Sequence, residues 1–172
     1  MIINFVGYYV AWLGLVLFGN VFVPFALALL VIHLLGVVTH PSRQKAELKL
    51  IVSVAMLGSL VDGLLTQLSI FHFHRGSLLP LLSIPYWLVI LWACFAATLA
   101  HSLKVLSKSK ILQALVGAVF APLSYVAGYK FDAVQLGYSV FSTYLVLATV
   151  WAVIIVVCFS LKDKFLSEVS CD

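Results

Sequence analysis

An acidic residue lies in the middle of a long apolar run, where charged side chains are rare. Asp62 stands 13 residues after Lys49, so in a regular helix it lies about 20 Å from the end of the run, near the middle of a membrane. Holding an ionised carboxylate there costs about 2.5–3.5 kcal/mol, so we expect Asp62 to face the protein interior and to be neutral or hydrogen-bonded. It is then either a functional group (a proton carrier, general base or substrate anchor) or a hydrogen-bonding link between helices.

Tyr125 and Ser124 are the polar residues that the sequence places closest to this depth. Tyr125 stands 14 residues after Ile111 in another apolar run, and the same helical rise brings it nearly level with Asp62. We therefore expect at least one hydrogen-bond partner for Asp62, with Tyr125 and Ser124 favoured by depth.

Two histidines lie near the ends of their apolar runs. His101 is two residues from the end of its run, with Thr98 on the same helical face, and His33 stands six residues before Thr39 at a similar depth. The two histidines could form one polar site, or each could be a separately hydrogen-bonded residue at a helix end. His101 lies about 16 Å in depth from Asp62, too far for direct proton transfer. The candidate polar site within the membrane therefore comprises Asp62, Ser124, Tyr125, Thr98, His101 and His33.

No metal site, cofactor site or catalytic residue is predicted. His72 and His74 form an H-x-H pair beside Arg75, but two histidines on a short loop are too few for a closed metal site. Signatures of serine hydrolases, zinc proteases, P-loops and dinucleotide-binding folds are absent. The three cysteines have no metal-binding spacing, so we expect them to be reduced and structural.

Two stripes of small and polar residues would position these groups. One keeps a spacing of three and four residues on a single helical face, and comprises Ala55, Ser59, Asp62, Thr66 and Ser69. The other is a seam of small residues that permits close helix packing, and comprises Ala114, Gly117, Ala121, Ser124 and Gly128.

The composition predicts an all-α, polytopic transmembrane bundle. Of 172 residues, 64% are hydrophobic and 9% are charged, whereas soluble domains carry about 25% charged residues. A soluble domain, a disordered chain, a nucleic-acid binder and a disulfide scaffold are thereby excluded. Six runs have the length of a membrane-spanning helix, which is about 17–25 residues. They predict a single transmembrane domain over 1–172, with helices at about 2–18, 21–39, 50–71, 79–103, 111–129 and 134–161.

The basic residues predict the orientation of the bundle. If the N-terminus is inside, the inner segments hold eight Lys and Arg residues and the outer turns hold only Arg75 and Lys130. Cytoplasmic loops are enriched in Lys and Arg, so both termini are expected to be cytoplasmic. The eight inner residues are Arg43, Lys45, Lys49, Lys104, Lys108, Lys110, Lys162 and Lys164.

Three segments resemble an uncharacterised family of small multi-pass bacterial inner-membrane proteins, defined as a domain of unknown function. They are DGLLTQLSIF (62–71), PYWLVILWACFAATLAHSL (85–103) and GAVFAPLSYVAG (117–128). The family features correspond to Asp62–Gly63, Pro85–Leu88, Thr98–Ser102 and Ala121–Tyr125, although Ala121 stands where the family has glycine. The resemblance implies an inner-membrane location. It also implies a lipid-linked role, because family members are often encoded beside enzymes that modify membrane fatty acids.

Three functions agree with these features. The first is an intramembrane enzyme or an accessory protein in membrane-lipid modification or homeostasis, and the accessory role is favoured because the chain has no recognised nucleophile–base pair. The second is a small carrier of a lipid or of a proton-coupled solute, and the third is a structural membrane partner. The expected partners are membrane lipids, a second copy of the chain or another membrane protein, and not nucleic acid. An enzyme requires polar groups that converge on one cavity, whereas a structural partner requires only a packing seam.

Overall fold

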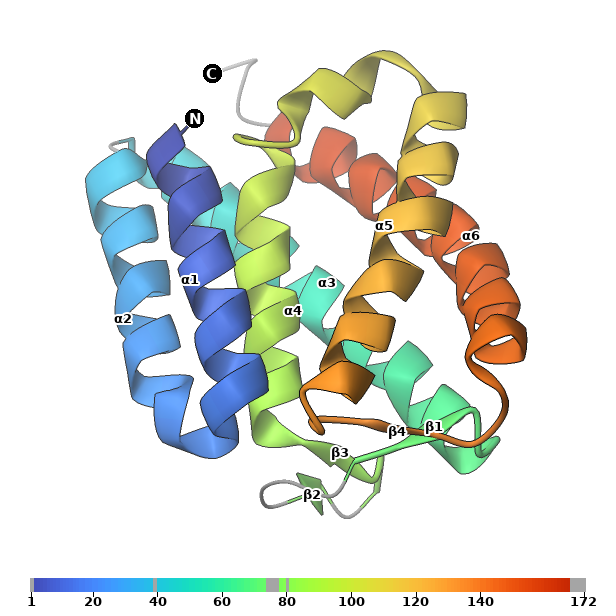
Figure 1. Ribbon diagram of the computed structural model, residues 1–172. Helices are drawn as coiled ribbons and strands as arrows, with labels where there is room; N and C mark the ends of the chain where they lie inside the picture. The colour runs from blue at the N-terminus through green and yellow to red at the C-terminus, as the bar shows by residue number, and fades with distance from the viewer. Residues whose placement is uncertain (1, 39, 74–77, 80, 168–172) are drawn as a thin grey trace.

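The computed structural model is an all-α bundle, and it describes residues 2–38, 40–73, 78–79 and 81–167 (Figure 1). Its α-helices are α1 (Ile2–Phe18), α2 (Val23–Ile32), α3 (Pro41–Gln67), α4 (Tyr86–Leu99), α5 (Lys110–Lys130) and α6 (Val140–Ser167). Two 3₁₀ turns, η1 (Gly19–Phe22) and η3 (Lys104–Lys108), and one π-turn, η2 (His33–Val37), join or extend them.

Within the part of the chain that the structure describes, four helical segments are long and apolar enough to cross a membrane, namely Asn4–Gly36, Pro41–Gln67, Lys110–Lys130 and Val140–Ser167. The first turns back at η1, so α1 and α2 form a hairpin (Figure 1). α4 is a shorter apolar helix of 14 residues, about 21 Å long. The sequence-based count of six full-length spans is therefore wrong, since α2 and α4 are shorter than the hydrocarbon core requires.

Several predicted helix boundaries also differ from the structure. The segment 40–49 was expected to be a loop, but α3 begins at Pro41, where proline suits the first helical position. The run 79–103 contains the two strands of a short antiparallel ribbon, β2 (Leu78–Leu79) and β3 (Ile84–Pro85), before α4 begins. α6 continues to Ser167, into residues that were expected to be a polar tail. Ser69 lies beyond α3 at a positive φ of 58°, so the polar stripe ends at Thr66.

The helices pack around α3 and α4 (Figure 1). The hairpin of α1 and α2 packs on α4, and α5 packs lengthwise on α6. At this second contact a Cβ atom at Gly117 would lie 2.6 Å from the carbonyl oxygen of Trp151, so the small-residue seam allows α5 to approach α6 closely. Many large apolar side chains remain exposed on these helices, among them Phe25, Leu60 and Phe120, as expected for a surface that faces lipid.

One end of the bundle, which we call the basic end, holds the start of α1, the start of α3, η3 and the end of α6 (Figure 1). The eight basic residues of the predicted inner segments belong to these elements or to the neighbouring start of α5. Lys130 ends α5 at the opposite end, beside strands β1 (Phe71–His72) and β4 (Gln135–Leu136), which pair antiparallel. Arg75 lies outside the described residues.

Candidate functional site

Asp62 links three helices at the centre of the bundle. Its side chain is completely buried on α3. The hydroxyl of Tyr125, on α5, donates a hydrogen bond to one carboxylate oxygen over 2.6 Å, and the indole N–H of Trp92, on α4, donates to the other over 2.7 Å. The expected partnership of Tyr125 with Asp62 is confirmed. Trp92, which was not among the predicted site residues, supplies the second donor.

Glycine at position 58 makes the contact with Trp92 possible. Gly58 lies one turn before Asp62, and a Cβ atom there would overlap the indole ring of Trp92. The ring therefore packs directly against the α3 backbone at Gly58 and donates its N–H to Asp62. Its other face stacks on Trp151 of α6, with ring centroids 4.8 Å apart and planes within 4°. This arrangement holds the Trp92 donor of Asp62 in position.

The other predicted hydroxyl groups do not reach Asp62. Ser124 donates to the carbonyl of Ala121, and Thr98 donates over 2.6 Å to the carbonyl of Phe95, each within its own helix. Ser59 and Thr66 lie on the same stripe as Asp62 and are buried, but their hydroxyls have no hydrogen-bond partner among the described residues. The site around Asp62 is thus smaller than the predicted set of residues.

A groove of about 670 Å³ runs along α4 between α1 and α5. Its wall is mostly aliphatic and aromatic, and Trp92 and Tyr125 contribute their rings. Phe5, Tyr9 and Phe120 border the groove and are exposed, so it opens to the surface of the bundle. Asp62 is absent from the described residues that line it. The hydroxyl-bearing residues along it are Tyr8, Tyr9, Thr98, Ser102, Ser124 and Tyr125.

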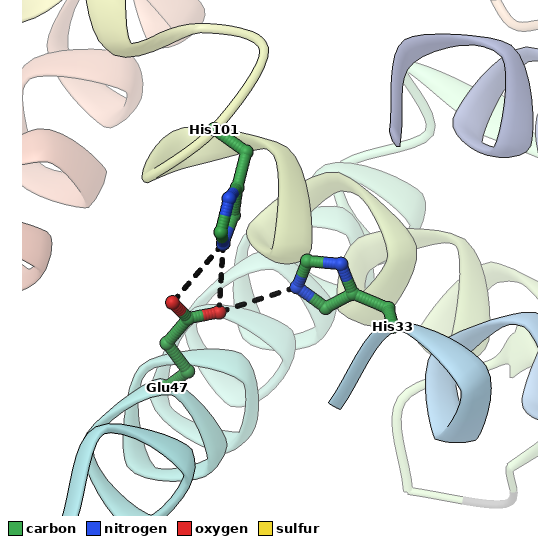
Figure 2. Close-up of side chains that lie close together, drawn as sticks. All are labelled: His33, Glu47 and His101. Carbon is green, nitrogen blue, oxygen red and sulfur yellow. Dashed lines mark hydrogen bonds and ion pairs between the residues drawn. The ribbon is translucent and has the colours of Figure 1, made fainter. Parts of the chain in front are cut away.

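A second buried cluster lies at the basic end, where His33, Glu47 and His101 converge from three helical segments (Figure 2). The Nε2 atom of His33 lies 3.2 Å from Oε2 of Glu47. The Nε2 atom of His101 lies 3.0 Å from both carboxylate oxygens. The two imidazole rings meet edge to face, with centroids 4.8 Å apart. Of the two alternatives that the sequence left open, the structure shows the one in which His33 and His101 lie together, and Glu47 joins them.

Neighbouring side chains hold this cluster in place. The amide nitrogen of Asn4, on α1, donates to Nδ1 of His33 over 3.2 Å and to the carbonyl of Ala97 over 3.1 Å. Ser102 donates to the amide oxygen of Asn4 over 2.5 Å. Arg43 lies one turn before Glu47 and donates from Nε to the carboxylate over 3.3 Å. Glu47 is only 2% exposed, whereas half of the Arg43 side chain is exposed.

Glu47 was missed because its surroundings in the sequence are polar and read as a loop. Two signals could have revealed it. Pro41 is a typical first residue of a helix, and Arg43 and Glu47 have the spacing of a helical ion pair. Extending the stripe of Ala55, Ser59 and Asp62 backwards by steps of four residues also reaches Glu47.

The H-x-H pair is only half described. His72 is exposed in β1, where it pairs with Gln135, and His74 lies outside the described residues. Cys94 and Cys158 are buried and are not joined in a disulfide, in agreement with a structural role.

The family was identified by comparison with known protein families. The model described as "Protein of unknown function (DUF2878)" matches residues 1–157, which is most of the chain. The chain belongs to the DUF2878 family. The resemblance to a family of unknown function is thereby confirmed, and the four candidate spans identify this DUF2878 protein as a multi-pass integral membrane protein. We found no match to it among curated proteins or among solved structures.

The two clusters of this DUF2878 protein differ in what they can do. The Asp62 carboxylate has one donor on each oxygen and no contact with the groove, which suits a structural link. The groove can hold a long apolar molecule. The cluster of His33, Glu47 and His101 combines a buried carboxylate with imidazole nitrogens, which are groups that exchange protons or bind metal ions.

Proposed function

We propose that this membrane protein is an accessory protein in membrane-lipid modification or homeostasis, and that it holds one acyl chain of a lipid in the groove between α1, α4 and α5. The groove is the observation that carries the proposal. Its volume of about 670 Å³ lies within the range of about 300–1,000 Å³ that is typical of small-molecule sites. Its wall is apolar, as a lipid chain requires.

The shape of the groove favours an extended chain. It follows α4 from Trp87 to Thr98, a distance of about 16 Å along the helix axis. The exposed residues at its border leave it open on one side, so a lipid can enter sideways from the bilayer without crossing a polar surface.

Charge at one end of the groove favours an anionic headgroup. Thr98 and Ser102 line the groove at the basic end, and the adjacent η3 turn carries the exposed Lys104 and Lys108. Lysine side chains near a membrane surface attract anionic lipids, with about 1 kcal/mol for each basic residue. The lipid would therefore lie with its headgroup at the basic end and its chain along α4.

The groove chemistry favours an accessory role over catalysis. Among the described residues that line it, no side chain combines a nucleophile with a neighbouring base. Asp62 is separated from the groove by the rings of Trp92 and Tyr125, which also argues against its use as a proton carrier for a transported solute.

The orientation belongs to the same proposal. We infer that the protein lies in a bacterial inner membrane with the basic end, and with it both termini, on the cytoplasmic side. The gathering of the described Lys and Arg residues at that end, with Lys130 opposite, supports this orientation.

The direct test is the lipid profile of a deletion strain. Total fatty acids and phospholipids should change in the deletion relative to its parent during normal growth or under oxidative stress, and the wild-type gene should restore them. Unchanged lipids in both conditions would contradict the proposal. A flux of a soluble solute through the purified protein would then favour a carrier instead.

A further inference from the structure

We propose that His33, Glu47 and His101 bind a borderline divalent cation, with Zn²⁺ as the reference ion. Each residue offers one ligand atom, and these atoms lie within 4.8 Å of one another. The carboxylate lies 3.0 and 3.2 Å from the two Nε2 atoms. Ligands around a tetrahedral zinc ion are about 3.3 Å apart, given bond lengths of about 2.0–2.2 Å. The distance from the carboxylate to each imidazole nitrogen thus already suits two ligands of one ion. The ligand atoms as a set spread over up to 4.8 Å, so one imidazole has to move inward when the ion binds.

The ligand set fits this class of cation. Two histidines and one glutamate leave an open coordination position, an arrangement found in catalytic zinc sites and, in a facial geometry, in non-haem iron sites. The sequence-based expectation of no metal considered only His72 and His74 and left Glu47 out.

The backbone brings the three ligands together by irregular turns. His33 begins the π-turn η2, where the N–H of Val38 reaches back five residues to the carbonyl of His33. π-turns within helices are frequent at functional sites. His101 follows the end of α4, where the N–H of Leu103 likewise bonds five residues back, to Thr98. Glu47 is fixed by the regular helix α3, so the two histidines are placed around a rigid carboxylate.

Asn4 determines which nitrogen of His33 carries its proton. In the present arrangement the Asn4 amide donates to Nδ1, so the proton of His33 is on Nε2 and points at Glu47. A bound cation would take the Nε2 lone pair, and the proton would then be on Nδ1. Asn4 would have to turn its amide and accept that proton through its oxygen. Asn4→Asp presents an acceptor to Nδ1 without this turn, and it gives up the hydrogen bond that the amide donates to the carbonyl of Ala97. We expect the gain at His33 to prevail, so that the variant binds the cation more tightly.

Arg43 is the competing cation. Its guanidinium bonds to Glu47, but the side chain is half exposed and can swing into water. Without a metal ion, Arg43 would balance the charge of the buried carboxylate and the two histidines would hydrogen-bond to it, as an ordinary structural cluster. That purely structural cluster is the alternative that the experiment has to distinguish.

The experiment measures metal binding to the full chain, purified in detergent with an affinity tag that contains no histidine. The chain is stripped with a chelator, reloaded with Zn²⁺ or Co²⁺, freed of excess metal and measured by elemental mass spectrometry. We expect one ion per chain, a visible absorption band with Co²⁺ and a higher thermal unfolding temperature with Zn²⁺. Glu47→Gln and His101→Ala should each lower the affinity at least about tenfold.

Two variants keep the proposal falsifiable. His40→Ala removes an exposed imidazole whose one described side-chain hydrogen bond is to Ser42, and it should bind metal like the wild type. Asn4→Asp should bind more tightly, a result that a loss of folding cannot imitate. The proposal would be overturned if the wild-type chain retained no stoichiometric metal, or if Glu47→Gln remained folded and bound metal as tightly as the wild type.

Discussion

Glu47 and Asp62 lie fifteen residues apart on α3, about 22 Å along its axis and within about 60° around it. Both carboxylates are buried, and each accepts hydrogen bonds from two other helical segments. One face of α3 thus carries both Glu47, in the cluster at the basic end, and Asp62, at the centre of the bundle. The position of α3 therefore determines the geometry of both.

Removing the hydroxyl of Tyr125 should weaken the bundle at its centre. Tyr125→Phe leaves Asp62 with Trp92 alone, and we expect a loss of about 1 kcal/mol in the free energy of unfolding. Tyr129→Phe, at an exposed position near the end of the same helix, should be neutral. Unfolding in detergent followed by circular dichroism measures both. Equal effects of the two variants would refute the structural link.

Two substitutions of Asp62 distinguish the effects of its two hydrogen bonds. Asp62→Asn keeps an acceptor for Tyr125 but directs an amide N–H₂ at the indole of Trp92, so the fold should persist with reduced stability. Asp62→Leu leaves two buried donors unpaired, and we expect it to cost about 1–3 kcal/mol for each donor. The unfolding temperature should therefore be highest for the wild type, lower for Asp62→Asn and lowest for Asp62→Leu. A Leu variant as stable as the Asn variant would contradict this account.

Gly58 should tolerate no side chain. A Cβ atom at this position would overlap the Trp92 ring, so Gly58→Ala must displace the ring and lengthen its bond to Asp62. We expect a loss of about 1–3 kcal/mol, as for other overpacked cores. Gly7→Ala is the matched control, because no atom lies within 4 Å of its added Cβ. Thermal unfolding should show destabilisation only for position 58.

Part of this arrangement could be predicted from the sequence. Tyr125 and Asp62 were paired by counting residues from the ends of two apolar runs, which works because regular helices rise uniformly through a layer of fixed thickness. Trp92 was not recognised as a donor, since an aromatic residue in an apolar run carries no sign of which way its N–H points. That direction depends on Gly58 of another helix.

Other features could not be predicted, because they arise from packing between distant segments. The groove depends on how far α1 and α5 stand apart along α4, and no local pattern records that spacing. The short length of α4 follows from the strands that replace its expected first turns. Glu47 was hidden by a polar segment whose helical signals, Pro41 and the pair Arg43–Glu47, are weaker than its loop-like composition.

Neutralising Arg43 should favour metal binding at the basic end. Arg43→Gln removes the positive charge that lies 3.3 Å from Glu47, and we expect the affinity for Co²⁺ to rise several-fold. Lys45→Gln makes the same change of charge two residues away on an exposed side chain, and should have a smaller effect. Titration followed by visible absorption compares the two variants. Identical affinities would show that Arg43 does not compete for the carboxylate.

The orientation can be tested by labelling single cysteines in intact cells. Lys108→Cys and Lys130→Cys lie at opposite ends of the bundle, and both are to be introduced into a chain whose native cysteines have been replaced. A maleimide that does not cross the membrane should label position 130 and spare position 108 until the cells are broken. The reverse pattern would overturn the proposed orientation.

The most direct measurement of the central claim is photo-crosslinking of a phospholipid to the groove. An anionic phospholipid with a photoactivatable group in its acyl chain is added to the protein in bilayers, and labelled residues are mapped by peptide mass spectrometry. We predict that labelling is concentrated at groove residues such as Leu91 and Phe95. It should be lost in Ala121→Phe, because the added ring fills the groove. It should be retained in the control Ala28→Phe, which adds the same ring to the exposed face of α2. Labelling spread evenly over exposed residues such as Leu60 and Val153, and unchanged by Ala121→Phe, would contradict the account.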